Sequence, residues 1–151
     1  MRETHRFNPW RRMRALGSTW KLKWSHDLPS DTYGSTDWGT RTITLAEGMS
    51  FEERRCTITH EVTHVQRGPA SGCGRIAEEV LVDRISARLL LPSMRDVADT
   101  LVFHRGDHDR AAADLWVDPW MLEVRLSALY GLERAYLHQR IDDVVLLAAD
   151  E

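Results

Sequence analysis

The chain has 151 residues, of which 42% are hydrophobic and 28% are charged. This composition is typical of one globular domain and excludes an intrinsically disordered or coiled-coil protein. No run approaches the roughly 18 apolar residues that a membrane-spanning helix needs. Two cysteines are too few for a disulfide framework, so a reducing environment is expected.

The net charge of −3 is unevenly distributed along the chain. Residues 1–25 contain seven Lys/Arg and one acidic residue, whereas the remainder contains thirteen basic and twenty-two acidic residues. A basic segment can bind nucleic acid or an acidic partner, but a solvated first helix is the simpler interpretation. The same segment lacks the apolar stretch of a signal peptide, so we expect a cytoplasmic protein with no membrane partner.

The first forty-five residues predict one helix and two strands. Pro9 at a helix start and Gly17 at its end predict a short helix between them. Residues 20–25 and 41–45 alternate apolar and polar side chains, as half-buried strands do. Residues 26–39 are rich in turn-forming residues and predict a connection without regular structure.

The helix that follows these strands has the strongest local signals. Ser50 and Glu53 have the spacing of a capping box, which predicts the start of the helix. Gly68-Pro69 predicts its end. Apolar residues at helical spacing predict one buried face, made up of Phe51, Ile58, Val62 and Val65.

The rest of the chain predicts helices only. Caps, prolines and apolar periodicity place them at residues 76–91, 93–104, 108–116, 118–130 and 132–148. The sequence therefore predicts an α+β fold, in which a small antiparallel or mixed sheet packs on a mainly helical body. No repeat or linker divides the chain, so one domain over 1–151 is expected. Its sheet and site helices occupy about 18–92 and a helical segment about 93–151.

Residues 60–64 read His-Glu-Val-Thr-His, the pattern H-E-x-x-H. On a helix, His60 and His64 lie on one face, so both imidazoles can bind one Zn²⁺ ion. Glu61 lies beside them and is placed to accept a proton from water at the metal as a general base. A helix with two histidines that bind no metal is the alternative interpretation.

A catalytic zinc site needs a third protein ligand and an open position. The metzincin extension is absent, because Arg67 and Ala70 stand where its glycine and its third histidine would be. Glu78 and Glu79 both qualify by position, in the first turn of the next helix. Glu79 is preferred, because Asp83 lies one turn further on and could orient a ligating histidine. Glu78 remains the alternative.

The segment Glu79-Val-Leu-Val-Asp83-Arg-Ile-Ser-Ala-Arg-Leu-Leu-Leu-Pro92 resembles a known signature, E-x-x-A-N-x-F-A-x-x-L-L-M-P. This signature belongs to the ImmA/IrrE family of bacterial and phage metallopeptidases, in which it follows H-E-x-x-H at a similar distance. Asp83 replaces the usual asparagine, Val82 the alanine and Ile85 the phenylalanine. Residues 113–126 also resemble the downstream, helix-turn-helix-like segment of that family, so the resemblance covers about residues 40–130.

This resemblance implies a minimal gluzincin, with a zincin-like body and Glu79 as the third zinc ligand. It implies an intracellular zinc-dependent endopeptidase that acts in a bacterial host cell and is encoded by a phage or prophage. It also implies a protein substrate, namely a helix-turn-helix transcriptional repressor whose cleavage relieves repression.

Two other functions are compatible with the same residues. One is a non-catalytic DNA-binding or regulatory protein with a structural zinc, in which residues 107–131 form a helix-turn-helix. Its presumed recognition helix offers Arg125 and little else for base contacts, since its Trp, Met, Leu and Val are expected in the core, so direct nucleic-acid binding is not expected. The other is a zinc peptidase of another role, such as a toxin component.

The substrate-binding groups are less well defined by the sequence. The strand at 41–45 could pair with an extended substrate if its edge is exposed. Four side chains could stabilise an oxyanion by their chemistry, although the sequence does not show that they lie near the metal: His26, Tyr33, His104 and His108.

Overall fold

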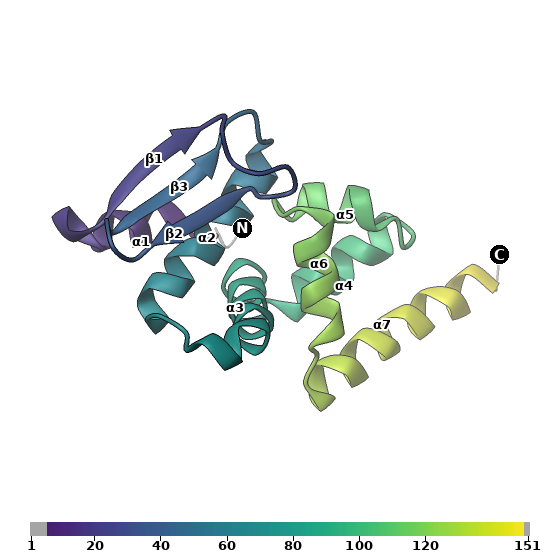
Figure 1. The fold of residues 1–151 in the computed structure, drawn as a ribbon. Helices are drawn as coiled ribbons and strands as arrows, with labels where there is room; N and C mark the ends of the chain where they lie inside the picture. The colour runs from purple at the N-terminus through teal and green to yellow at the C-terminus, as the bar shows by residue number, and fades with distance from the viewer. Residues whose placement is uncertain (1–5, 150–151) are drawn as a thin grey trace.

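The computed structural model describes residues 6–149, so residues 1–5 of the basic N-terminal segment and residues 150–151 lie outside the described part. The described chain has an α+β fold with a small sheet at one side and helices α4 to α7 at the other (Figure 1). The strands are β1 Lys21–Ser25, β2 Gly34–Asp37 and β3 Thr42–Ala46. The helices are α1 Pro9–Ala15, α2 Phe51–Arg67, α3 Arg75–Leu90, α4 Met94–Phe103, α5 His108–Asp114, α6 Pro119–Ser127 and α7 Gly131–Ala149.

The strands form one mixed sheet in the order β1-β3-β2. β1 runs parallel to β3, and β2 runs antiparallel to it. β3 is therefore the central strand, with a neighbour on each side. The prediction that the strand at 41–45 offers an exposed edge to a substrate is wrong, because the outer strands of the sheet are β1 and β2.

β2 lies inside the segment 26–39, where the sequence predicts only a turn-rich connection, so this prediction is wrong for residues 34–37. The strand lacks an apolar alternation because its inward positions are Gly34 and Thr36. Both lie against side chains of α2 and not against the apolar core. β2 is recognisable only by its pairing with β3.

The sheet and α2 enclose the first apolar core. Ile43 and Leu45 of β3 are fully buried, as their alternation predicts, and Ile58 and Val62 of α2 pack against them. Burying one such side chain stabilises the fold by about 1.5–3 kcal/mol. This packing fixes α2 across the inner face of the sheet.

The predicted limits of α2 are confirmed. Ser50 accepts a hydrogen bond from the Glu53 backbone, the Glu53 side chain accepts one from Ser50, and Gly68 ends the helix. The predicted apolar face is wrong at Phe51, whose ring is exposed and contacts Trp116 edge-on at a centroid distance of 5.6 Å. Phe51 is the first residue of the helix, and its ring packs on Trp116, which follows α5, and not on the sheet.

A second core lies between α3 and the C-terminal helices. It includes Cys56 of α2 and Ala87 and Leu90 of α3, together with buried residues of α4 to α7. The expected segments 18–92 and 93–151 therefore share a core. No helix within residues 6–149 has both the length and the apolar character needed to cross a membrane.

Helix α6 carries the largest fully buried side chain described, that of Arg125. Its Nε donates to the Leu91 carbonyl at 2.9 Å, and its Nη2 donates to Glu133 of α7 at 2.5 Å. The expectation that the Trp of this helix lies in the core is wrong, because Trp120 is 64% exposed, whereas Met121 and its apolar neighbours are buried. Arg125 thus joins α3, α6 and α7.

Candidate metal centre

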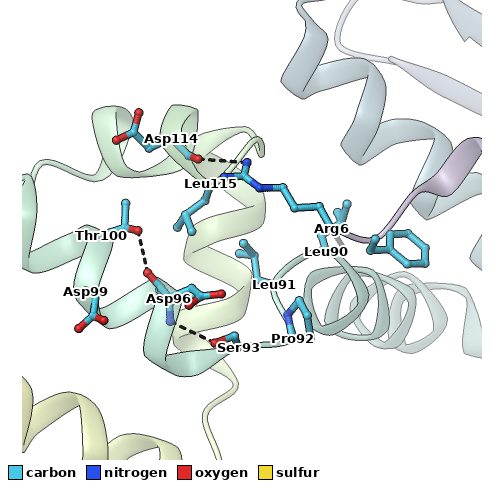
Figure 2. Close-up of a pocket in the computed structure, with 12 residues that line it drawn as sticks. Arg6, Leu90, Leu91, Pro92, Ser93, Asp96, Asp99, Thr100, Asp114 and Leu115 are labelled. Atoms are coloured by element: carbon cyan, nitrogen blue, oxygen red, sulfur yellow. Dashed lines mark hydrogen bonds between the residues drawn. The ribbon is translucent and has the colours of Figure 1, made fainter. Parts of the chain in front are cut away.

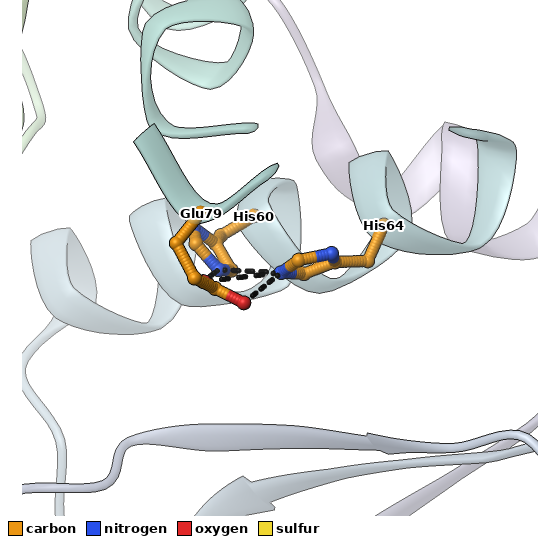
Figure 3. Close-up of side chains that lie close together, drawn as sticks. All are labelled: His60, His64 and Glu79. Atoms are coloured by element: carbon orange, nitrogen blue, oxygen red, sulfur yellow. Dashed lines mark hydrogen bonds and ion pairs between the residues drawn. The ribbon is translucent and has the colours of Figure 1, made fainter. Parts of the chain in front are cut away.

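Two histidines and one glutamate converge between α2 and α3 (Figure 3). His60 and His64 lie one helical turn apart, and their Nε2 atoms are 3.0 Å apart. Glu79 comes from the first half of α3, and its Oε2 lies 3.1 Å from Nε2 of His60 and 3.3 Å from Nε2 of His64. The structure therefore brings together the three residues that the sequence predicts as metal ligands.

The spacing of these three donor atoms fits a zinc ion. Two ligands of a tetrahedral zinc, each about 2.0–2.1 Å from the metal, lie roughly 3.3 Å apart. The shortest separations between donor atoms of His60, His64 and Glu79 are 3.0, 3.1 and 3.2 Å. Two imidazoles and one carboxylate also form a donor set that leaves a fourth position for water or substrate.

Asp83 orients one of these histidines. Its Oδ1 lies 2.8 Å from Nδ1 of His60, so Nε2 of the same ring faces Glu79 and His64. Burial lowers the pKa of His60, but the hydrogen bond to Asp83 and the nearby Glu61 and Glu79 carboxylates outweigh it and raise this pKa. The surroundings of the cluster therefore favour a positive charge.

Glu78 and Glu79 point to different partners, which separates the two alternatives that the sequence leaves open. The Glu78 carboxylate accepts two hydrogen bonds from Arg67, at 2.6 and 3.0 Å. These bonds lower the pKa of Glu78. Because Glu78 is engaged at the end of α2, Glu79 is the glutamate that faces the histidines.

Glu61 lies next to the cluster but is held against the sheet. Only 6% of the residue is exposed, and its Oε2 accepts a hydrogen bond from the Thr36 hydroxyl at 2.6 Å. Burial is the largest influence and raises the pKa of Glu61, while the bond from Thr36 acts in the opposite direction. Sequence reasoning missed Thr36, because nothing local indicates which residue of 26–39 faces the motif helix.

His60 and Glu61 line two hollows. One has a volume of about 330 Å³ and is lined also by Tyr33 and Asp83. The other has a volume of about 580 Å³ and is lined also by His64, Glu79 and the loop after α2. All three candidate ligands therefore line the second hollow, and His60 with Glu61 also lines the first.

Of the four oxyanion candidates, the structure brings only Tyr33 to these hollows. The three histidines lie elsewhere and pair with separate carboxylates. His26 contacts Glu47 at 2.6 Å and His104 contacts Asp114 at 2.6 Å, whereas His108 pairs with Glu123.

A further cavity, of about 560 Å³, lies between the N-terminal residues, the α3–α4 junction and α5 (Figure 2). Leu90 and Leu91 line one side of it, and Asp96 lines another. Arg6 crosses its upper edge and donates to the Asp114 carbonyl at 3.3 Å. The residues predicted for the metal site do not line this cavity, so it is separate from the candidate centre.

Comparison of the chain with protein-family models, curated proteins and solved structures finds no match. The geometry of the described residues is therefore the basis on which a function can be proposed. That geometry combines three side chains that could hold a metal ion, one buried carboxylate beside them and two adjoining hollows.

Proposed function

We propose that this chain is a zinc-dependent endopeptidase of the ImmA/IrrE kind, with His60, His64 and Glu79 as the zinc ligands. The observation that carries the proposal is the convergence of these side chains with the spacing of a tetrahedral site. Glu61 lies beside them as the general base, and Asp83 orients His60. A zincin-like body and a helix-turn-helix-like segment formed by α5 and α6 belong to the same proposal.

Zinc bound at this site would act as a Lewis acid that polarises a peptide carbonyl and acidifies a water molecule. Glu61 accepts the proton of this water and then transfers it to the nitrogen of the leaving amine. Its burial and raised pKa suit this role, because a base works best when its pKa approaches the operating pH.

The proposed substrate is a helix-turn-helix repressor inside a bacterial cell. This part of the proposal rests on the resemblance of residues 79–92 to the family signature. An extended segment of the substrate would lie along β2, the strand at the sheet edge nearest the two hollows. A role as a DNA-binding protein is less well supported, because the one basic residue expected to contact bases, Arg125, is buried and paired with Glu133.

The experiment that tests this function uses a helix-turn-helix repressor encoded beside the gene of this chain. The two purified proteins are incubated with Zn²⁺, with and without a chelator, and fragments are identified by mass spectrometry. We expect one defined cleavage that the chelator abolishes and that added Zn²⁺ restores. Salt-dependent DNA binding by the isolated chain, without any cleavage, would contradict the proposal.

The metal ligands can be tested without a substrate. We expect one zinc per wild-type chain, and an affinity reduced by more than about tenfold in Glu79→Ala, because this change removes a ligand. Glu78→Ala is the matched control, since its carboxylate binds Arg67, and it should keep the wild-type affinity. Competition with a chromophoric chelator measures the zinc affinity of each variant. Equal losses in the two variants would show that Glu79 has no special role.

A further inference from the structure

Three carboxylates surround the two histidines, but only one of them joins the metal-binding group. The donor atoms of His60, His64 and Glu79 lie within 4.8 Å of one another, and Glu61 is not a member of this group. Asp83 is occupied by Nδ1 of His60. The position of Glu61 therefore needs its own explanation, because a free carboxylate next to a zinc ion is itself a good ligand.

The Glu61 carboxylate is held by β2. Within residues 6–149, the hydroxyl of Thr36 supplies the one hydrogen bond found at this carboxylate, at 2.6 Å. The strand register explains the contact, since Thr36 pairs with the inward-facing Ile43 of β3 and therefore points toward α2. A buried carboxylate that lost this donor would have to find another partner or a proton.

Gly34 makes room for this arrangement two residues earlier on the same strand. A Cβ atom at Gly34 would lie 2.8 Å from Oε1 of Glu61 and 2.6 Å from Cγ2 of Thr57. Both distances are too short for real side chains, so only glycine lets β2 approach Glu61 this closely. Thr36 and Gly34 thus act together on one carboxylate.

We propose that Thr36 is a positioning residue that keeps Glu61 out of the metal coordination sphere and so preserves an open coordination position. The inference rests on the proposed function. Its chemical basis is that a catalytic zinc has three protein ligands, and a fourth would displace the water or substrate. The hydrogen bond from Thr36 satisfies one oxygen of Glu61 and turns the carboxylate toward the sheet.

Cobalt substitution tests this role without any substrate. Co²⁺ is titrated into the wild type and Thr36→Val, and the visible absorption is recorded. In Thr36→Val we expect Glu61 to coordinate the ion, so the visible bands weaken as the coordination number rises, and Co²⁺ binds about tenfold more tightly. Thr36→Ser should retain the wild-type spectrum, because it keeps the hydroxyl.

Two further variants make the outcome specific. The double variant Thr36→Val with Glu61→Gln should return to the wild-type spectrum, because an amide is a much weaker ligand than a carboxylate. Thr44→Val is the matched control, since Thr44 lies on β3 between the buried Ile43 and Leu45 and faces the opposite side of the sheet. If Thr36→Val does not fold, Thr36→Ala is used in its place, because it removes the same hydroxyl.

The possible failures can be told apart. If the wild type binds Co²⁺ and Thr36→Val matches it in spectrum and affinity, the role of Thr36 is wrong and the proposed function stands. If the wild type binds neither Zn²⁺ nor Co²⁺, the proposed function is wrong and this inference with it.

Discussion

Replacing Glu61 by glutamine is expected to reduce kcat/KM for repressor cleavage by about 10²–10⁴-fold while leaving zinc bound. The amide keeps the size of the side chain and can still meet the Thr36 hydroxyl, so the fold and the three ligands are preserved. It has no basic oxygen that can accept the proton of water at neutral pH. Cleavage is measured under single-turnover conditions, and zinc is measured on the same sample.

Glu52→Gln is the matched control for this variant. Glu52 lies on the same helix, in its first turn, and undergoes the same chemical change far from the histidines. It should retain wild-type activity. Full activity of Glu61→Gln would rule out a general base at this position, and loss of zinc from it would mean that Glu61 is a ligand.

Replacing Arg125 by methionine is expected to reduce the free energy of unfolding by about 1–3 kcal/mol, the usual cost of leaving a buried hydrogen-bonding group without its partner. Arg125 is 1% exposed, and its loss leaves the Leu91 carbonyl and the Glu133 carboxylate without this partner. Denaturation by urea, followed by circular dichroism, measures the change. A loss below about 1 kcal/mol would contradict the role of Arg125 in joining α3, α6 and α7.

Acidification provides a second readout for the same variant. The hydrogen bond from Arg125 is the largest of the causes that lower the pKa of Glu133 from 4.5 to about 2. This pairing therefore stabilises the wild type fully above about pH 4.5, and its contribution is lost as the pH falls toward 2. The wild type should lose more stability than Arg125→Met over this range. Equal losses of unfolding free energy in the two proteins would mean that the pairing of Arg125 with Glu133 does not determine the acid sensitivity.

The local elements of this protein are well determined by its sequence. Ser50 with Glu53 marks the start of α2, and the four-residue spacing of His60 and His64 places both rings on one face. These signals are reliable because each depends on residues within one or two helical turns. The limits of α2 and the presence of a small sheet could therefore be predicted before the fold was known.

The contacts between elements are determined only by the tertiary structure. The sequence favours Glu79 over Glu78 by its spacing to Asp83 but leaves both open, and only the structure shows that Arg67 at the end of α2 holds Glu78. β2 has no apolar pattern of its own, so neither the strand nor the contact of Thr36 with Glu61 is visible in the sequence. Pairing across a sheet or between helices depends on register and on distant neighbours.

The burial of Arg125 also depends on contacts with residues that are distant in the sequence. From its own residues this helix is expected to bury its Trp and to offer Arg125 for base contacts, yet Trp120 is exposed, and Glu133 on α7 and the Leu91 carbonyl hold the guanidinium inside. The sequence by itself determined the helices and the H-E-x-x-H motif, because backbone capping and side-chain periodicity act locally. The tertiary structure decided which carboxylate faces the histidines and which is held by the sheet, because those contacts join residues that are far apart along the chain.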